Sequence, residues 1–108
     1  MTAAILVVVA CGEVSNVVGG RSTTITVGNN FFSPTPDTVP AGQVPFSWTG
    51  STMQHDIIWD SGPTPLPADS PPQFAGSFTA TLVMGTYTYH CEFHGGPMSG
   101  MRGTLVVE

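Results

Sequence analysis

GTYTYHCEFHGGPMSGMRGTLVVE occupies residues 85–108 and holds two strand-like segments around a glycine-rich centre. Tyr87, Tyr89 and Cys91 share one parity, so a strand through them points all three side chains toward the same face. Residues 104–107 predict a closing strand. Between the two, EFHGGPMSGM contains three glycines, which predict a loop that folds back on itself.

The same period of two recurs upstream of this segment. Side chains of shared parity form four further sets, namely Ile25 and Val27, then Val44, Phe46 and Trp48, then His55, Ile57 and Trp59, and lastly Phe78, Ala80 and Leu82. Each set predicts one half-buried strand. Pro45 predicts a sheet edge or a bulge, because proline cannot donate to a ladder. SGPTPLPADSPP, with five prolines, predicts an extended surface loop.

Composition restricts both the fold class and the partners. The chain has 108 residues, enough for one domain. Its 13 glycines and 10 prolines leave little room for helices, so we predict an all-β fold. Lys and Arg together number 2 against 7 Asp and Glu, and the net charge is -5. Nucleic acid is excluded as a partner, because no cationic surface is present to neutralise phosphates.

Strand parity turns two metal-binding side chains toward the core. Cys91 follows Tyr87 and Tyr89, and His55 precedes Ile57 and Trp59 on their face. His94 lies three positions after Cys91, and the glycine-rich loop can bring either Met98 or Met101 close. One thiolate, two imidazoles and a weak thioether are the ligands of a blue-copper electron-transfer site. Zinc prefers four firm ligands and fits this set less well.

These motifs resemble those of the plastocyanin-like cupredoxins. Residues 85–108 are similar to the family's C-terminal pattern, in which a G-T-Y strand leads to C-x2-H, then to G-M-x-G and a final strand. NNFFSPTPDTVPAGQVPFSWTGSTMQHDIIW is similar to the family stretch that runs through an F-x-P element and a P-x-G turn to the first ligand histidine. The resemblance covers residues 23–108. It implies a cupredoxin-type Greek-key β-sandwich of about seven to eight strands.

The resemblance also implies which side chains hold one copper ion that cycles between Cu(I) and Cu(II). The family's four copper ligands fall on His55, Cys91, His94 and Met101. Plastocyanins commonly place four residues between the second histidine and the methionine, whereas here Met98 follows after three and Met101 after six. Met101 is preferred, because residues 100–107 register with the family's final strand and a weak axial bond tolerates a longer loop.

Two neighbours of the ligands depart from the family pattern. Asp56 stands where the family often has an asparagine that ties two ligand loops together, and His90 stands where an aromatic residue often precedes the cysteine. Parity turns His90 away from Cys91, so we predict it at the surface near the site. Met53 and Met84 are interpreted as gap-filling core residues.

The N-terminal segment has a different character from the rest. Residues 3–10 form an apolar run of eight, too short to span a bilayer as a helix. VVAC resembles a bacterial lipobox, which implies lipidation of Cys11 and positive charge upstream of Met1. A buried strand with a packed Cys11 is the alternative. We therefore divide the chain into a partial signal and polar tether, residues 1–22, and a cupredoxin domain, residues 23–108.

A disulfide between Cys11 and Cys91 competes with copper for the Cys91 thiol. Such a bridge requires Cys11 to reach the core from beyond a polar tether, with Cα atoms within about 7 Å. We therefore prefer a free Cys91 thiol.

We expect a non-enzymatic, monomeric electron carrier that meets a redox donor and an acceptor transiently. We expect it to be periplasmic or otherwise extracytoplasmic, with anchoring through lipidated Cys11. One alternative is copper storage or delivery through exposed Met98 and His90. Another is the electron-transfer domain of a copper oxidase or nitrite reductase system. A trinuclear copper cluster cannot be built from the 3 histidines of this chain.

Overall fold

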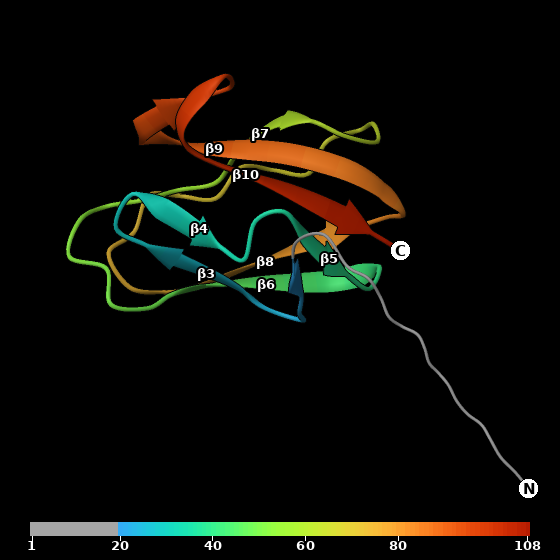
Figure 1. Ribbon diagram of the computed structural model, residues 1–108, viewed down its shortest axis with the longest axis horizontal. Helices are drawn as coiled ribbons and strands as arrows, with labels where there is room; N and C mark the ends of the chain where they lie inside the picture. Colours follow the sequence, from blue (N-terminus) through green and yellow to red (C-terminus); the bar gives the residue numbers. More distant parts are fainter. Residues whose placement is uncertain (1–19) are drawn as a thin grey trace, which may run out of the picture.

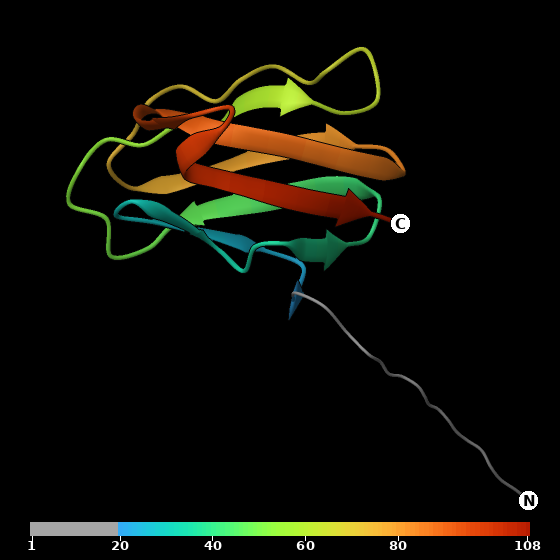
Figure 2. The same ribbon diagram turned by 45° about the horizontal axis from the view of Figure 1, so that its top comes forward.

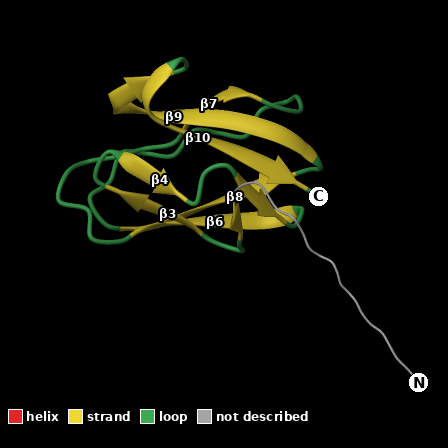
Figure 3. Cartoon of the chain, in the orientation of Figure 1, coloured by secondary structure: helices red, strands yellow, loops and turns green. Residues whose placement is uncertain are grey.

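The alternating segments form strands in the computed structural model, which describes residues 20–108, except that the strand predicted from His55 begins only at Ile58. The strands are β2 (Gly20–Arg21), β3 (Ile25–Gly28), β4 (Phe31–Ser33), β5 (Asp37–Val39), β6 (Gly42–Trp48), β7 (Ile58–Ser61), β8 (Gly76–Leu82), β9 (Gly85–Gly96) and β10 (Ser99–Val107). Within residues 20–108 every regular element is a strand (Figure 3). This part of the chain therefore contains no helix that could cross a membrane.

Two mixed sheets lie one over the other (Figures 1 and 2). The five-stranded sheet has the order β2-β5-β10-β9-β7, and the four-stranded sheet has the order β4-β3-β6-β8. The prediction of an all-β Greek-key sandwich is confirmed. The strands number nine among residues 20–108, rather than seven to eight. Gly20 and Arg21, in the predicted tether, pair with Asp37 and Thr38 of β5.

The predicted inward faces of the strands meet in the core between the sheets. Tyr89 of β9 is fully buried, and its ring lies 4.8 Å from Phe32 and 5.5 Å from Phe46 between centroids, in T-shaped contacts. Trp59 of β7 adds a third such contact at 5.5 Å. Gly103 of β10 is required beside this ring, because a Cβ there would lie 2.5 Å from Tyr89. The cluster therefore fixes β9 just before Cys91.

Pro45 lies in a strand that is interior to its sheet, since β6 stands between β3 and β8. The ladder with β3 begins only at Phe46, paired with Ile25, so Pro45 pairs with β8 alone through Thr79. The predicted edge therefore exists locally. It arises because β3 is shorter than β6.

The segment predicted as a loop before the last strand is mostly a hairpin. β9 continues to Gly96 and β10 already begins at Ser99, so only Pro97 and Met98 remain outside the two strands. Gly96 pairs with Ser99, and Gly95 pairs with Gly100. The glycines allow this close pairing. In contrast, residues 62–75 between β7 and β8 hold no strand, as their prolines predicted.

Two methionines do not fill the core as the sequence interpretation supposed. Met84 is 74% exposed in the turn between β8 and β9, and Met53 is 37% exposed in the loop after β6. This interpretation was wrong. Both residues lie outside the strands, where no alternation directs a side chain inward.

The two core tyrosines differ in how their hydroxyls are satisfied. The Tyr89 hydroxyl is buried and has no hydrogen-bond partner among residues 20–108. The Tyr87 hydroxyl accepts the backbone N–H of Val83 at 3.2 Å. Burying an unpaired polar group destabilises a fold, whereas a made hydrogen bond stabilises it modestly.

Tyr89→Phe should therefore raise the free energy of unfolding by about 1 kcal/mol, because the ring contacts stay and an unpaired hydroxyl is removed. Tyr87→Phe is the matched control and should lower it by about 0.5–1.5 kcal/mol. Urea denaturation of the metal-free protein measures both. A Tyr89→Phe variant less stable than the parent would show that this hydroxyl has a stabilising partner.

Candidate metal centre

The geometry of the centre begins with an irregular ladder between β9 and β10. His90 pairs with Arg102, and Gly95 pairs with Gly100. Residues 91–94 of β9 therefore lie opposite the single residue Met101 of β10. The extra chain on β9 forms a bulge, which turns side chains that a regular ladder would send to opposite faces. Cys91 and His94 meet for this reason.

His55 reaches the same place from the segment between β6 and β7. Its backbone N–H donates to Gln73 O, and Gln73 N–H donates to His55 O, both at 3.1 Å. The indole N–H of Trp48 also donates to His55 O at 3.1 Å. The main chain of His55 is thus held by the loop before β8 and by the end of β6.

The structure brings His55, Cys91 and His94 together. Their ligand atoms all lie within 4.8 Å of one another. Among residues 20–108, no other group of three or more His, Cys, Asp or Glu side chains converges in this way. Cys91 Sγ is 3.8 Å from His55 Nδ1 and 3.6 Å from His94 Nδ1. The two imidazole rings are tilted by 48° with centroids 4.7 Å apart. One sulfur and two ring nitrogens therefore converge on one point.

The candidate axial residues occupy opposite environments. Met101 is 2% exposed and lies opposite residues 91–94 in the ladder, whereas Met98 is 88% exposed in the hairpin turn. A methionine in the core beside the converging donors suits a buried metal centre. The burial supports the preference for Met101.

Burial also shapes the ionisation of the metal-free donors. Burial raises the pKa of the Cys91 thiol, whereas backbone hydrogen bonds from Asp56, Phe93 and His94 act to lower this pKa. Burial lowers the pKa of His55, and the nearby His94 lowers it further. A neutral imidazole and a soft sulfur are the forms in which these side chains meet a metal. The donor set fits copper, which binds both thiolate and imidazole.

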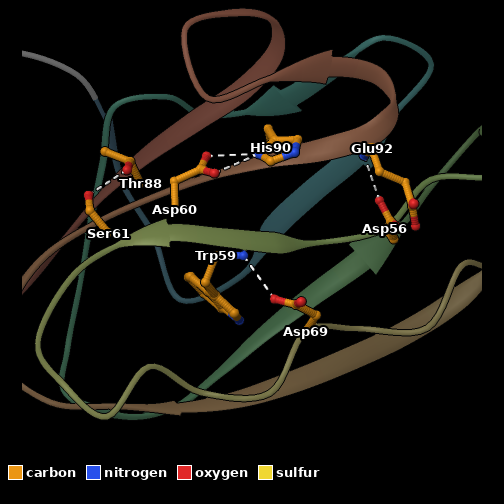
Figure 4. A network of polar contacts seen from close by, with 8 residues as sticks. All are labelled: Asp56, Trp59, Asp60, Ser61, Asp69, Thr88, His90 and Glu92. Atoms are coloured by element: carbon orange, nitrogen blue, oxygen red, sulfur yellow. Dashed lines mark hydrogen bonds and ion pairs between the residues drawn. The ribbon is translucent and has the colours of Figure 1, made fainter.

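Asp56 joins two of the segments that carry the candidate ligands, although it stands where an asparagine is common in the family. Its Oδ1 accepts the backbone N–H of Glu92 at 2.9 Å, which joins the residue after His55 to the residue after Cys91 (Figure 4). Asp56 is fully buried, and its Oδ2 has no hydrogen-bond partner among residues 20–108. The nearby Asp56 side chain raises the pKa of the exposed Glu92 carboxyl.

His90 does point away from Cys91, but it is not the open surface residue that parity suggested. Its Nδ1 lies 2.8 Å from Asp60 Oδ1, and both side chains are only 13% exposed (Figure 4). Asp60 belongs to β7, which pairs with β9 along this edge. Strand parity alone could not predict Asp60 as the partner, because it lies on the neighbouring strand.

Sequence reasoning missed Asn29, in the turn between β3 and β4. Its side-chain Oδ1 lies 3.0 Å from His55 Nε2. A double asparagine, as at residues 29–30, is typical of a tight turn, but nothing in the sequence linked this pair to a histidine 26 positions away.

Cys11 and the proposed lipobox lie outside the described residues, so their predictions stay open. Cys91 is a free, buried cysteine within residues 20–108.

Comparison with solved structures gives three informative likenesses. A mutant plastocyanin of fern is 31% identical, with 79% of this chain and 99% of that chain covered and a TM-score of 0.59. A reduced mutant of amicyanin is 27% identical, with 79% of this chain and 80% of that chain covered and a TM-score of 0.61. No protein-family model and no curated protein sequence matches the chain.

The third likeness is to a copper-containing nitrite reductase from Thermus scotoductus SA-01. It is 23% identical with a TM-score of 0.62, and 80% of this chain is covered. This chain spans only 22% of that enzyme. At this identity and coverage the likeness concerns the fold alone.

The hairpin glycines give a test of the bulge, because they differ in the space around them. A Cβ at Gly95 would lie 2.5 Å from the backbone N and 2.8 Å from the O of Met101, whereas one at Gly96 would meet nothing within 4 Å. Gly95→Ala should displace the Met101 backbone and cost about 1–3 kcal/mol. Gly96→Ala should change stability by less than about 0.5 kcal/mol.

Chemical denaturation of the metal-free variants measures this difference, and visible spectra after Cu(II) addition report on the centre. Equal stability and identical spectra for the two variants would show that the Gly95 contact does not position Met101.

Proposed function

This chain belongs to the plastocyanin-like cupredoxins, and from that premise we propose that it is a non-catalytic carrier of single electrons. The metal is one copper ion, and we assign His55, Cys91, His94 and Met101 as its ligands. Convergence of one sulfur and two imidazole nitrogens within 4.8 Å is the observation that supports this assignment most strongly. Bound copper supplies the one-electron exchange between Cu(I) and Cu(II).

The protein's part is to hold the donors in one arrangement for both oxidation states. Cys91 and His55 are fully buried, and Met101 is nearly so. Packing and the hydrogen bonds at His55 and Asp56 restrain these segments. Such restraint keeps the rearrangement on electron transfer small, because ligands locked by their neighbours do not relax freely.

We propose that electrons enter and leave through His94. Of the four assigned ligands it alone is partly exposed, at the base of a hairpin whose rim consists of Gly95, Gly96, Pro97 and Met98. This rim carries no charge, and Phe93 beside it is 47% exposed. A small uncharged face suits brief contact with a redox partner, because weak electron-transfer encounters bury less than about 1,200 Å².

An enzymatic role has less support. The nitrite reductase likeness covers 22% of that protein. The third histidine of this chain, His90, is bound to Asp60 instead of lying in the group around Cys91. We therefore propose electron transfer rather than oxidation or nitrite reduction by this chain.

Copper storage or delivery is the second candidate, favoured by the 88% exposure of Met98. His90, the other residue that this role would use, is covered and paired. Rapid loss of copper to a chelator would favour delivery, whereas slow loss favours the carrier.

We further propose an extracytoplasmic, monomeric protein anchored through lipidated Cys11. The lipobox-like residues 8–11 and the small polar residues that follow support this location. The redox donor and acceptor are transient partners.

The decisive test is the visible and electron-spin spectrum after addition of Cu(II) to the full chain. We expect an intense blue band and a narrow copper hyperfine splitting, because a thiolate bonded to Cu(II) produces both. Cys91→Ser should abolish the band and leave the fold, since Cys91 is not needed for the strand pattern. Cys11→Ser is the matched control and should keep the band. A band that survives Cys91→Ser would refute the assignment.

The two methionines provide a second test. Met101→Leu should raise the reduction potential by about 60 mV or more, which corresponds to a tenfold change in relative affinity for the two oxidation states. The reason is that a donor favouring Cu(II) is lost. Met98→Leu should leave the potential nearly unchanged, because its side chain lies in solvent. Voltammetry measures both, and the reverse result would exchange their roles.

A further inference from the structure

The turn between β3 and β4 is built to carry Asn29 in one place. Gly28 pairs with Phe31, so Asn29 and Asn30 alone make the turn. Asn30 has φ 66°, a left-handed conformation that asparagine tolerates better than most residues. The ring of Phe31 lies over Gly28, where a Cβ would be 2.2 Å from it. The backbone before Asn29 is therefore closely packed.

The side-chain amide of Asn29 has a determined orientation. Its Oδ1 accepts the backbone N–H of Thr52 at 3.1 Å, and its Nδ2 donates to Thr52 Oγ1 at 2.8 Å. A backbone N–H can only donate, so the atom facing it must be the amide oxygen. The same oxygen lies 3.0 Å from His55 Nε2. An amide oxygen only accepts, and His55 Nε2 must therefore carry the proton.

This contact determines which nitrogen of His55 is open to a metal. With the proton on Nε2, the lone pair of a neutral imidazole is on Nδ1, and Nδ1 is the atom that faces Cys91 Sγ at 3.8 Å. The bonds to Gln73 and Trp48 hold only the backbone of His55. Among residues 20–108, the one hydrogen bond made by His55 Nε2 is to Asn29.

We propose that Asn29 is a positioning residue of the metal centre, which fixes the tautomer and ring orientation of His55 and strengthens Nδ1 as a donor. This inference rests on the proposed function, because it concerns the copper ligand assigned there. Acceptors on the far nitrogen of a ligand histidine have this effect in metal sites generally, and their loss typically weakens metal binding 10–100-fold. A stronger imidazole donor favours Cu(II) over Cu(I).

The first measurement needs no metal. Long-range proton–nitrogen correlation spectra of the metal-free full chain should show His55 with its proton on Nε2. In Asn29→Leu this preference should weaken, because leucine offers no acceptor. A proton on Nδ1 in the unmodified protein would overturn the inference.

The second measurement is Cu(II) and Cu(I) affinity together with the reduction potential. Asn29→Leu should weaken Cu(II) binding about 10–100-fold, weaken Cu(I) binding less, and so raise the potential. Asn29→Asp keeps an acceptor for His55 Nε2 and adds negative charge, so it should restore Cu(II) binding and lower the potential below that of the parent.

Thr52→Val is the matched control, because it removes the Nδ2 bond to Thr52 Oγ1 and leaves the His55 contact. Its potential should equal the parent's. If Asn29→Leu does not fold, the shift in Asn29→Asp decides alone. If the folded Asn29 variants have the same reduction potential as the parent, Asn29 only supports the loop and does not position His55.

Failure of the proposed function would be seen separately, as an unmodified protein without a blue band. A protein with the band, but with unaltered potentials in these variants, would disprove only the role of Asn29.

Discussion

Between the pair His90–Arg102 and the pair Gly95–Gly100, β9 has the four residues 91–94, whereas β10 has only one residue, Met101. A regular antiparallel ladder would send Cys91 and His94 to opposite faces, because their positions differ by an odd number. The extra residues on β9 remove this conflict and place both side chains beside the same core methionine. The hairpin beyond the bulge then closes through Gly95 and Gly100, and the site depends on that closure.

The bulge needs a rigid base, because extra unpaired residues would otherwise slide along the ladder. That base is the aromatic cluster on Tyr89, two residues before Cys91, with Phe32 and Phe46 from the opposite sheet. Gly103 leaves the space that the Tyr89 ring requires. The core therefore fixes the register of β9 up to the point where regular pairing stops.

Local periodicity was enough to predict β3, β6, β8 and β9 and the inward direction of Cys91 and His55, but it did not predict the short strands β2, β4 and β5. Each strand buries one face, so the side chains of that face repeat every second residue and can be counted along the chain. The same counting could not reveal the bulge, because a bulge is defined by the partner strand. It therefore predicted a loop where the hairpin continues.

Contacts between distant segments were also hidden from the sequence. Asn29 meets His55 across 26 positions and Asp60 meets His90 across 30, and neither pair belongs to a local motif. The family resemblance named the ligands that recur in cupredoxins. It also drew attention to Asp56, where an asparagine is common, but it could not show that a carboxylate there still accepts the backbone N–H of Glu92.

The fold restrains the two histidines of the centre to different degrees, and this difference suits electron transfer. His55 is fully buried and bound at its backbone and at its ring. His94 belongs to the bulge, and among residues 20–108 its ring makes one hydrogen-bond contact, with Cys91 Sγ. A centre held firmly on one side resists rearrangement, while the partly exposed ring on the other side gives a partner close approach. The four ligands that we propose leave no open position for a substrate, which a catalytic metal centre requires.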